Sequence, residues 1–164
     1  MHKSLTTILM FTMFWIGGCN DAAFKGDAGN DFKGEEALFR PIAMRIHPFT
    51  QIAVDENTRT PILETRVELL DQMGDVTKSA GRFRFEVYAS PVNASSSQQR
   101  QVAVWMVPVN DLKTTRQHWD PITRTYVFKL TLDQIPSDDI RLRLNAQFIG
   151  PTSQRLTDER IVHP

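Results

Sequence analysis

The chain has 164 residues, and its 19 lysine and arginine residues balance 19 aspartate and glutamate residues. This length suits one domain with a substantial hydrophobic core and is short for two. The balanced charge lacks the basic character of a nucleic-acid-binding protein, so we predict no nucleic-acid partner. Cys19 is the only cysteine. An internal disulfide is therefore excluded, and the core must stabilise the fold.

The first residues have the composition of an export signal. A short cationic start, ending at Lys3, precedes the uncharged and mostly apolar residues 5–16. This segment has the length of a secretory signal, whereas a transmembrane helix needs about 20 apolar residues. Two glycines follow, as cleavage beside the membrane requires. We therefore predict a signal peptide at residues 1–18 that is removed.

The residues around the cysteine, Ile16-Gly17-Gly18-Cys19, resemble the lipobox of bacterial lipoproteins. The resemblance implies cleavage before Cys19 and acylation of its thiol, with no cofactor besides this covalent lipid. Two or more acyl chains hold a protein stably on a membrane. The family's sorting pattern also implies that Asn20, in place of aspartate, favours the outer membrane over the inner membrane. An ordinary signal peptide that ends near a cysteine is the alternative.

The lipidated cysteine and a tether are predicted at residues 19–37. Residues 20–37 are rich in Gly, Asp, Ala and Asn and show no sustained hydrophobic period. This composition is typical of a flexible linker. We assign the remaining residues, 38–164, to a single folded domain.

The sequence of that domain predicts a series of short strands. Side chains alternate strictly in several of them. In residues 81–89, Phe83, Phe85 and Val87 fall on one face, and residues 140–149 repeat the pattern with five apolar side chains on one face. The six predicted strands lie within residues 43–49, 62–71, 81–89, 101–109, 125–132 and 140–149.

Turn-forming residues separate these strands, and helix is nearly absent. The one predicted helix lies within residues 110–119, where Asn110 or Asp111 can cap about two turns. Strands that are apolar on one face must pair those faces, which predicts an all-β antiparallel sandwich of about six to eight strands. Residues 65–88 resemble the strand-turn-strand of bacterial immunoglobulin-like and transthyretin-like domains. The resemblance implies an immunoglobulin-like sandwich and no particular activity.

Catalytic motifs are missing from the mature sequence. His47, His118 and His163 are not spaced like metal ligands. There is no G-x-S-x-G motif, no phosphate-binding glycine loop, and no cysteine beyond the predicted lipidation site. We therefore predict that the protein is not an enzyme and that it binds no metal.

Two aromatic features are candidate binding sites. A turn brings Trp119, Arg124 and Tyr126 together, and aromatic and arginine side chains on loops are common binding anchors. In the alternative interpretation, Trp119 closes one end of the sandwich. Trp105 lies on a strand that is apolar on both faces, which indicates either a covered central strand or an interface.

Arginines form a further candidate surface on the polar faces of the strands. In one interpretation they pair with glutamates on neighbouring strands, contributing a few tenths of a kcal/mol each. If they gather on one sheet instead, they form a platform for an anionic polymer or an acidic partner. The candidate residues are Arg82, Arg84, Arg141 and Arg143, with Arg45 and Arg66 in the same pattern.

Two functions follow from these features. The first is a membrane-anchored bacterial envelope lipoprotein whose non-catalytic β-sandwich binds a protein partner, as an interaction or assembly module. The second is a glycan-binding module that uses Trp119, Tyr126 and the arginine face. Glycan binding requires exposed aromatic rings, whereas protein docking prefers an apolar patch or an open strand edge.

Overall fold

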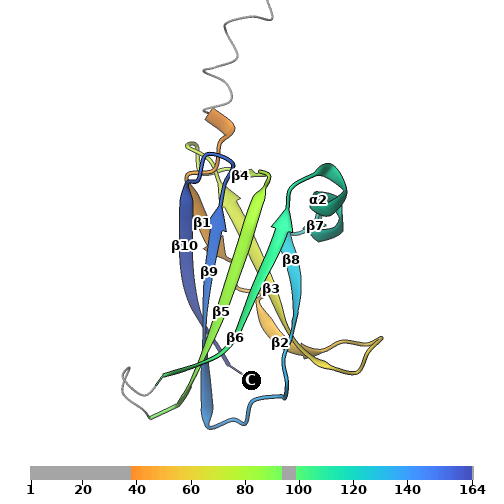
Figure 1. Ribbon diagram of the computed structural model, residues 1–164, viewed down its shortest axis with the longest axis vertical. Helices are drawn as coiled ribbons and strands as arrows, with labels where there is room; N and C mark the ends of the chain where they lie inside the picture. The colour runs from red at the N-terminus through yellow and green to blue at the C-terminus, as the bar shows by residue number, and fades with distance from the viewer. Residues whose placement is uncertain (1–37, 94–98, 164) are drawn as a thin grey trace, which may run out of the picture. The chain divides into compact units, whose positions relative to one another are not determined.

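The computed structural model describes residues 38–93 and 99–163. The predicted signal peptide, Cys19 and the predicted tether lie outside the described residues. Within the described part of the chain, no helix is both long and apolar enough to cross a membrane. The described residues form two antiparallel sheets and one short helix (Figure 1).

The predicted all-β class is confirmed, with ten strands in the described residues instead of six to eight. Sheet A has the order β1-β3-β8-β7, with β2 and β4 also paired to β3, and sheet B has the order β10-β9-β5-β6. The strands are β1 (Ala43–Ile46), β2 (Gln51–Val54), β3 (Pro61–Leu70), β4 (Val76–Thr77), β5 (Gly81–Pro91), β6 (Arg100–Val109), β7 (Trp119–Asp120), β8 (Thr125–Thr131), β9 (Ile140–Ile149) and β10 (Arg155–Val162).

The alternating sequence pattern explains why the two sheets pack together. Phe83, Phe85 and Val87 of β5 are completely buried, while Arg82 is exposed and Arg84 is half-buried. Strand β9 alternates in the same way from Arg141 to its end. Since successive side chains of a strand point to opposite faces, each sheet has one apolar face, and the two apolar faces form the core.

Aromatic side chains dominate this core. The ring centroid of Phe83 lies 5.1 Å from that of Tyr126, 4.8 Å from that of Phe128 and 5.0 Å from that of Phe148. These tilted contacts join β5 and β9 of sheet B to β8 of sheet A. Tilted ring pairs stabilise a core beyond the free energy of area burial alone.

The two long edges of the sandwich differ. On one side, the backbone N–H of Ile46 in β1 donates to Asp158 Oδ2 of β10 at 2.7 Å, which links sheet A to sheet B. On the other side, β6 has β5 as its only strand partner among the described residues. The outer edge of β6 is therefore open to pairing.

The predicted helix is present as α2 (Leu112–His118). Asp111 is its N-cap, and its carboxylate accepts a hydrogen bond from the backbone N–H of Thr114 at 2.7 Å. The Thr114 hydroxyl in turn accepts one from the Asp111 backbone N–H, which completes a capping box. No residue of α2 is buried, so the helix lies on the surface of the sandwich.

Candidate functional site

The four arginines singled out on β5 and β9 share one surface. Arg82, Arg84, Arg141 and Arg143 all point away from the core of sheet B, on what we call the sheet B face. Arg45 and Arg66 lie on sheet A, and both are paired with acids. The four arginines of sheet B thus share one face, but ion pairs occur on both sheets: Arg84 and Arg143 of sheet B pair with acids, as Arg45 and Arg66 of sheet A do.

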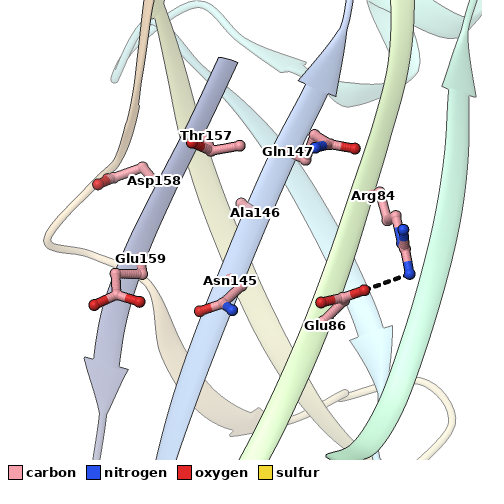
Figure 2. Close-up of a pocket in the computed structure, with 8 residues that line it drawn as sticks. All are labelled: Arg84, Glu86, Asn145, Ala146, Gln147, Thr157, Asp158 and Glu159. Atoms are coloured by element: carbon pink, nitrogen blue, oxygen red, sulfur yellow. Dashed lines mark ion pairs between the residues drawn. The ribbon is translucent and has the colours of Figure 1, made fainter. Parts of the chain in front are cut away.

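A polar groove of about 500 Å³ runs across the sheet B face (Figure 2). Cross-strand register places Glu86 of β5, Asn145 of β9 and Glu159 of β10 in one row. The adjacent row is equally polar and consists of Arg84, Gln147 and Thr157. The groove therefore offers amide, carboxylate, hydroxyl and guanidinium groups side by side.

Ion pairs neutralise part of this surface. Arg84 pairs with Glu86, and Arg143 Nη1 lies 3.8 Å from Glu159 Oε2. The Arg143 guanidinium also lies over the Tyr88 ring, 5.4 Å from its centroid, in cation-π geometry. Tyr88 donates a hydrogen bond to Glu86 Oε2 at 3.0 Å, and this bond raises the pKa of the Tyr88 hydroxyl.

Two buried polar atoms on this face have no hydrogen-bond partner among the described residues, Arg143 Nε and Asn145 Oδ1. Buried polar atoms in folded proteins are nearly always hydrogen-bonded, to protein or to water. Asn145 lines the groove, so its oxygen is an available acceptor there. Within the described residues, no three His, Cys, Asp or Glu side chains converge as a metal site.

The open edge strand β6 is apolar on its solvent side. Val102, Val104 and Met106 are 36 %, 48 % and 51 % exposed. Trp105 points the other way and packs against the core, as its alternation with these residues predicts. A groove of about 620 Å³ lies beside β6, between Trp105 and the segment that follows β8. Of the two predicted roles for this strand, the covered central position is wrong, because β6 lies at the edge of its sheet.

The three residues predicted around the 119–126 turn do not share a surface. Tyr126 is completely buried, and its hydroxyl donates to the Ser79 carbonyl and accepts from the Ser79 N–H. Trp119 is half-buried against the core, with its ring 5.3 Å from that of Tyr126. Arg124 is exposed and donates to the Val76 carbonyl at 3.4 Å. This arrangement agrees with the interpretation in which Trp119 closes one end of the sandwich.

Sequence reasoning missed a charged cluster on the outer face of sheet A. The half-buried Arg66 guanidinium donates to Glu64 Oε1 and Asp120 Oδ2, each at 2.8 Å. These hydrogen bonds bring β3 and the 120–124 turn together, with the exposed Phe49 and Ile122 beside them. The only signal in the sequence was Asp120 before a proline, which marks a turn without showing what it contacts.

Acid should weaken this ion-paired structure. The hydrogen bond from Arg66 lowers the pKa of Asp120 to about 2, and the one from Lys129 lowers that of Asp55 to about 2. A carboxylate whose pKa is lowered in the folded protein stabilises the fold at pH values above its ordinary pKa of about 4. This stabilisation is lost as the pH falls through the pKa of the folded protein. As the pH is lowered from about 4 to about 2, we expect the urea concentration at the midpoint of unfolding to fall, and to fall less in the double variant Asp55→Asn/Asp120→Asn. An equal fall in the unaltered protein and the double variant would contradict this role of the two carboxylates.

Comparison of the whole chain with protein-family models, with curated proteins and with solved structures finds no match. The described fold nevertheless defines a class: an all-β protein of two packed antiparallel sheets. The surface of sheet B adds a polar face and an open, apolar edge.

Proposed function

We propose that this protein is a membrane-anchored bacterial envelope lipoprotein whose non-catalytic β-sandwich is a protein-interaction module. The lipobox resemblance at residues 16–19 supports the anchor, with Cys19 as the lipidated residue and Asn20 favouring the outer membrane. The immunoglobulin-like or transthyretin-like resemblance of residues 65–88 belongs to the same proposal as its fold, and it implies no particular activity.

The open edge of β6 is the observation that carries the interaction module. Edge strands are usually protected by charges, bulges or a covering segment, since unpaired N–H and C=O groups invite pairing. From Arg100 to Val109, β6 has a single charge, at its first residue. The register with β5 shifts at Val102, and Pro108 lies near the other end of the strand; between them the exposed side chains are Val104 and Met106. Such an edge suits the addition of an extended segment from a partner.

In this mode, backbone hydrogen bonds to β6 supply most of the binding geometry. Val104 and Met106, each about half exposed, supply apolar contact on the outer face. The groove between Trp105 and the segment after β8 lies on the other side of the strand and can receive alternate side chains of the added segment. The occupant we propose is therefore an extended peptide with apolar side chains.

A crosslinking experiment in cells tests this proposal. Tagged full-length protein, crosslinked and purified from solubilised membranes, should carry one envelope protein in near-equal amount, identified by mass spectrometry. Val104→Lys/Met106→Lys should reduce recovery of that partner about tenfold or more, because lysine on an edge strand opposes pairing.

The matched control is Ile161→Lys, at a residue 40 % exposed on β10, the opposite edge of the same sheet. This variant should recover the partner as the unaltered protein does. Equal loss in both variants would contradict a role for the β6 edge, and recovery of no stoichiometric protein would contradict the interaction module.

The polar groove of the sheet B face favours a second function, glycan binding. Sugar hydroxyls both donate and accept hydrogen bonds, and the groove combines Glu86, Asn145 and Gln147 with an unpartnered Asn145 Oδ1. The burial of Tyr126 removes one aromatic ring from the site first expected for this function. Recovery of glycan fragments without a stoichiometric protein, lost in Asn145→Ala, would favour this alternative.

A further inference from the structure

The two ends of the described sandwich carry opposite charge. We call them the β4 end, where β1 begins and β3 turns into β4, and the β2 end, where β2 turns into β3. In the loops, strand starts and helix α2 of the β4 end, seven basic side chains accompany the four acids Asp71, Asp75, Asp111 and Asp120. The basic residues are Arg40, Lys78, Arg82, Lys113, Arg116, Arg124 and Arg155.

The β2 end has the reverse balance. Its turn between β2 and β3 and its segment between β8 and β9 together hold five acids, and Asp55 among them is paired with Lys129. Its turns and strand starts hold three further basic residues, Arg59, Arg100 and Arg141. The five acids are Asp55, Glu56, Asp133, Asp138 and Asp139. The domain is therefore electrostatically polar along its strands.

Exposed apolar side chains accompany the basic residues of the β4 end. Leu38, Phe39 and Met73 are 43 %, 57 % and 66 % exposed. Hydrogen bonds anchor the backbone at two of these positions: the Phe39 carbonyl accepts a hydrogen bond from Thr77 Oγ1 at 2.8 Å, and Asp71 Oδ1 accepts one from the Met73 N–H at 2.9 Å. Apolar tips among basic side chains are typical of surfaces that rest on an anionic bilayer.

The position of Leu38 links this end to the predicted anchor. Residues 20–37 separate Leu38 from Cys19, and 18 residues span at most about 65 Å when fully extended. A lipid on Cys19 therefore confines the domain near the bilayer, and the chain enters the domain at the β4 end (Figure 1). Basic side chains there are attracted to anionic headgroups, whereas the acidic β2 end is repelled.

We infer that the β4 end of the domain rests against an anionic phospholipid surface, with Leu38, Phe39 and Met73 in the headgroup layer. This inference rests on the proposed lipid anchor. It implies that the β2 end points away from the bilayer, so that an incoming partner meets β6 from the Arg100 end. The lipid keeps the protein on the membrane, and the β4 end sets its orientation.

Headgroup quenching of a fluorescent label tests the orientation. Acylation blocks the Cys19 thiol, so a cysteine introduced by Met73→Cys or by Ile135→Cys, an exposed residue between β8 and β9, is the single reactive thiol. The full-length acylated protein is placed in vesicles of phosphatidylcholine and phosphatidylglycerol with a spin-labelled headgroup. We expect the label at 73 to be quenched severalfold more than the label at 135.

Charge variants test whether electrostatic attraction to the headgroups orients the domain. The difference in quenching between the labels at 73 and 135 should be mostly lost in the triple variant Arg40→Gln/Lys78→Gln/Arg155→Gln. It should also be mostly lost in vesicles of phosphatidylcholine alone. The matched variant of the β2 end, Arg59→Gln/Arg100→Gln, should keep it. Persistence of the full difference without phosphatidylglycerol would overturn the assignment of an anionic surface.

The outcomes also distinguish this inference from the proposed anchor. Protein that floats with the vesicles but shows equal quenching at both positions overturns the orientation and leaves the anchor standing. The same holds if a protein partner, captured by a crosslinker at position 73, covers the β4 end. Protein that fails to float with vesicles, or whose Cys19 thiol reacts before any cysteine is introduced, overturns the anchor and the inference together.

Discussion

Cys19→Ala is expected to move this protein from the membrane fraction to the soluble fraction. The alanine has no thiol to acylate, so the proposed lipid anchor cannot be attached. Two or more acyl chains hold a protein stably on a membrane, so the loss of the lipid should move most of the protein to the soluble fraction. Fractionation of cells that produce each protein, followed by immunoblotting, measures it.

A second measurement keeps this prediction testable if the signal peptide remains uncleaved in the variant. Cells fed an alkyne-tagged fatty acid should label the unaltered protein and not Cys19→Ala. Ser4→Ala, directly after the cationic start of the predicted signal, is the control and should be labelled normally. Equal labelling of the Cys19 variant, or its complete recovery in the membrane fraction after cleavage, would contradict lipidation at this residue.

Phe83→Ala should destabilise the folded domain by about 3–5 kcal/mol, the range for removing a buried aromatic ring. Phe83 is completely buried, and its ring contacts rings from both sheets, including Phe128 at 4.8 Å and Phe148 at 5.0 Å. The cavity left by the ring would lie between the sheets, where neighbouring rings cannot collapse without shifting a strand. Urea unfolding followed by circular dichroism measures the change in the free energy of unfolding.

Phe49→Ala is the matched control, because it removes the same ring from a site that is 60 % exposed. Its effect should be within about 0.5 kcal/mol. A loss below about 1 kcal/mol in Phe83→Ala would show that the two sheets do not pack through this aromatic cluster.

Strict alternation of apolar and polar side chains made some strands predictable from the sequence. Strands β5 and β9 alternate apolar and polar side chains along their length because one face of each is completely buried. Strand β10 was missed, since its sequence places Asp158 and Arg160 among the side chains on the inward side. Asp158 is there for a tertiary reason, as it accepts the Ile46 N–H of the other sheet.

The edge position of β6 was within reach of sequence analysis. Pro108 lies inside the strand, and proline, which cannot donate to a neighbouring strand, is confined mainly to sheet edges. The apolar pattern alone allowed a central strand or an interface. Adding the proline would have favoured the edge, and with it an interface.

The sequence by itself determined the class of fold and the predicted anchor, because strand alternation and the lipobox are local patterns that depend only on near neighbours in the chain. Which surfaces come together was decided only by tertiary structure. Strand order placed four arginines on the sheet B face and paired Arg66 with Asp120, and it buried Tyr126, predicted to lie at a binding turn. These outcomes depend on contacts between residues far apart in sequence, and alternation within one strand does not specify which strand lies beside it.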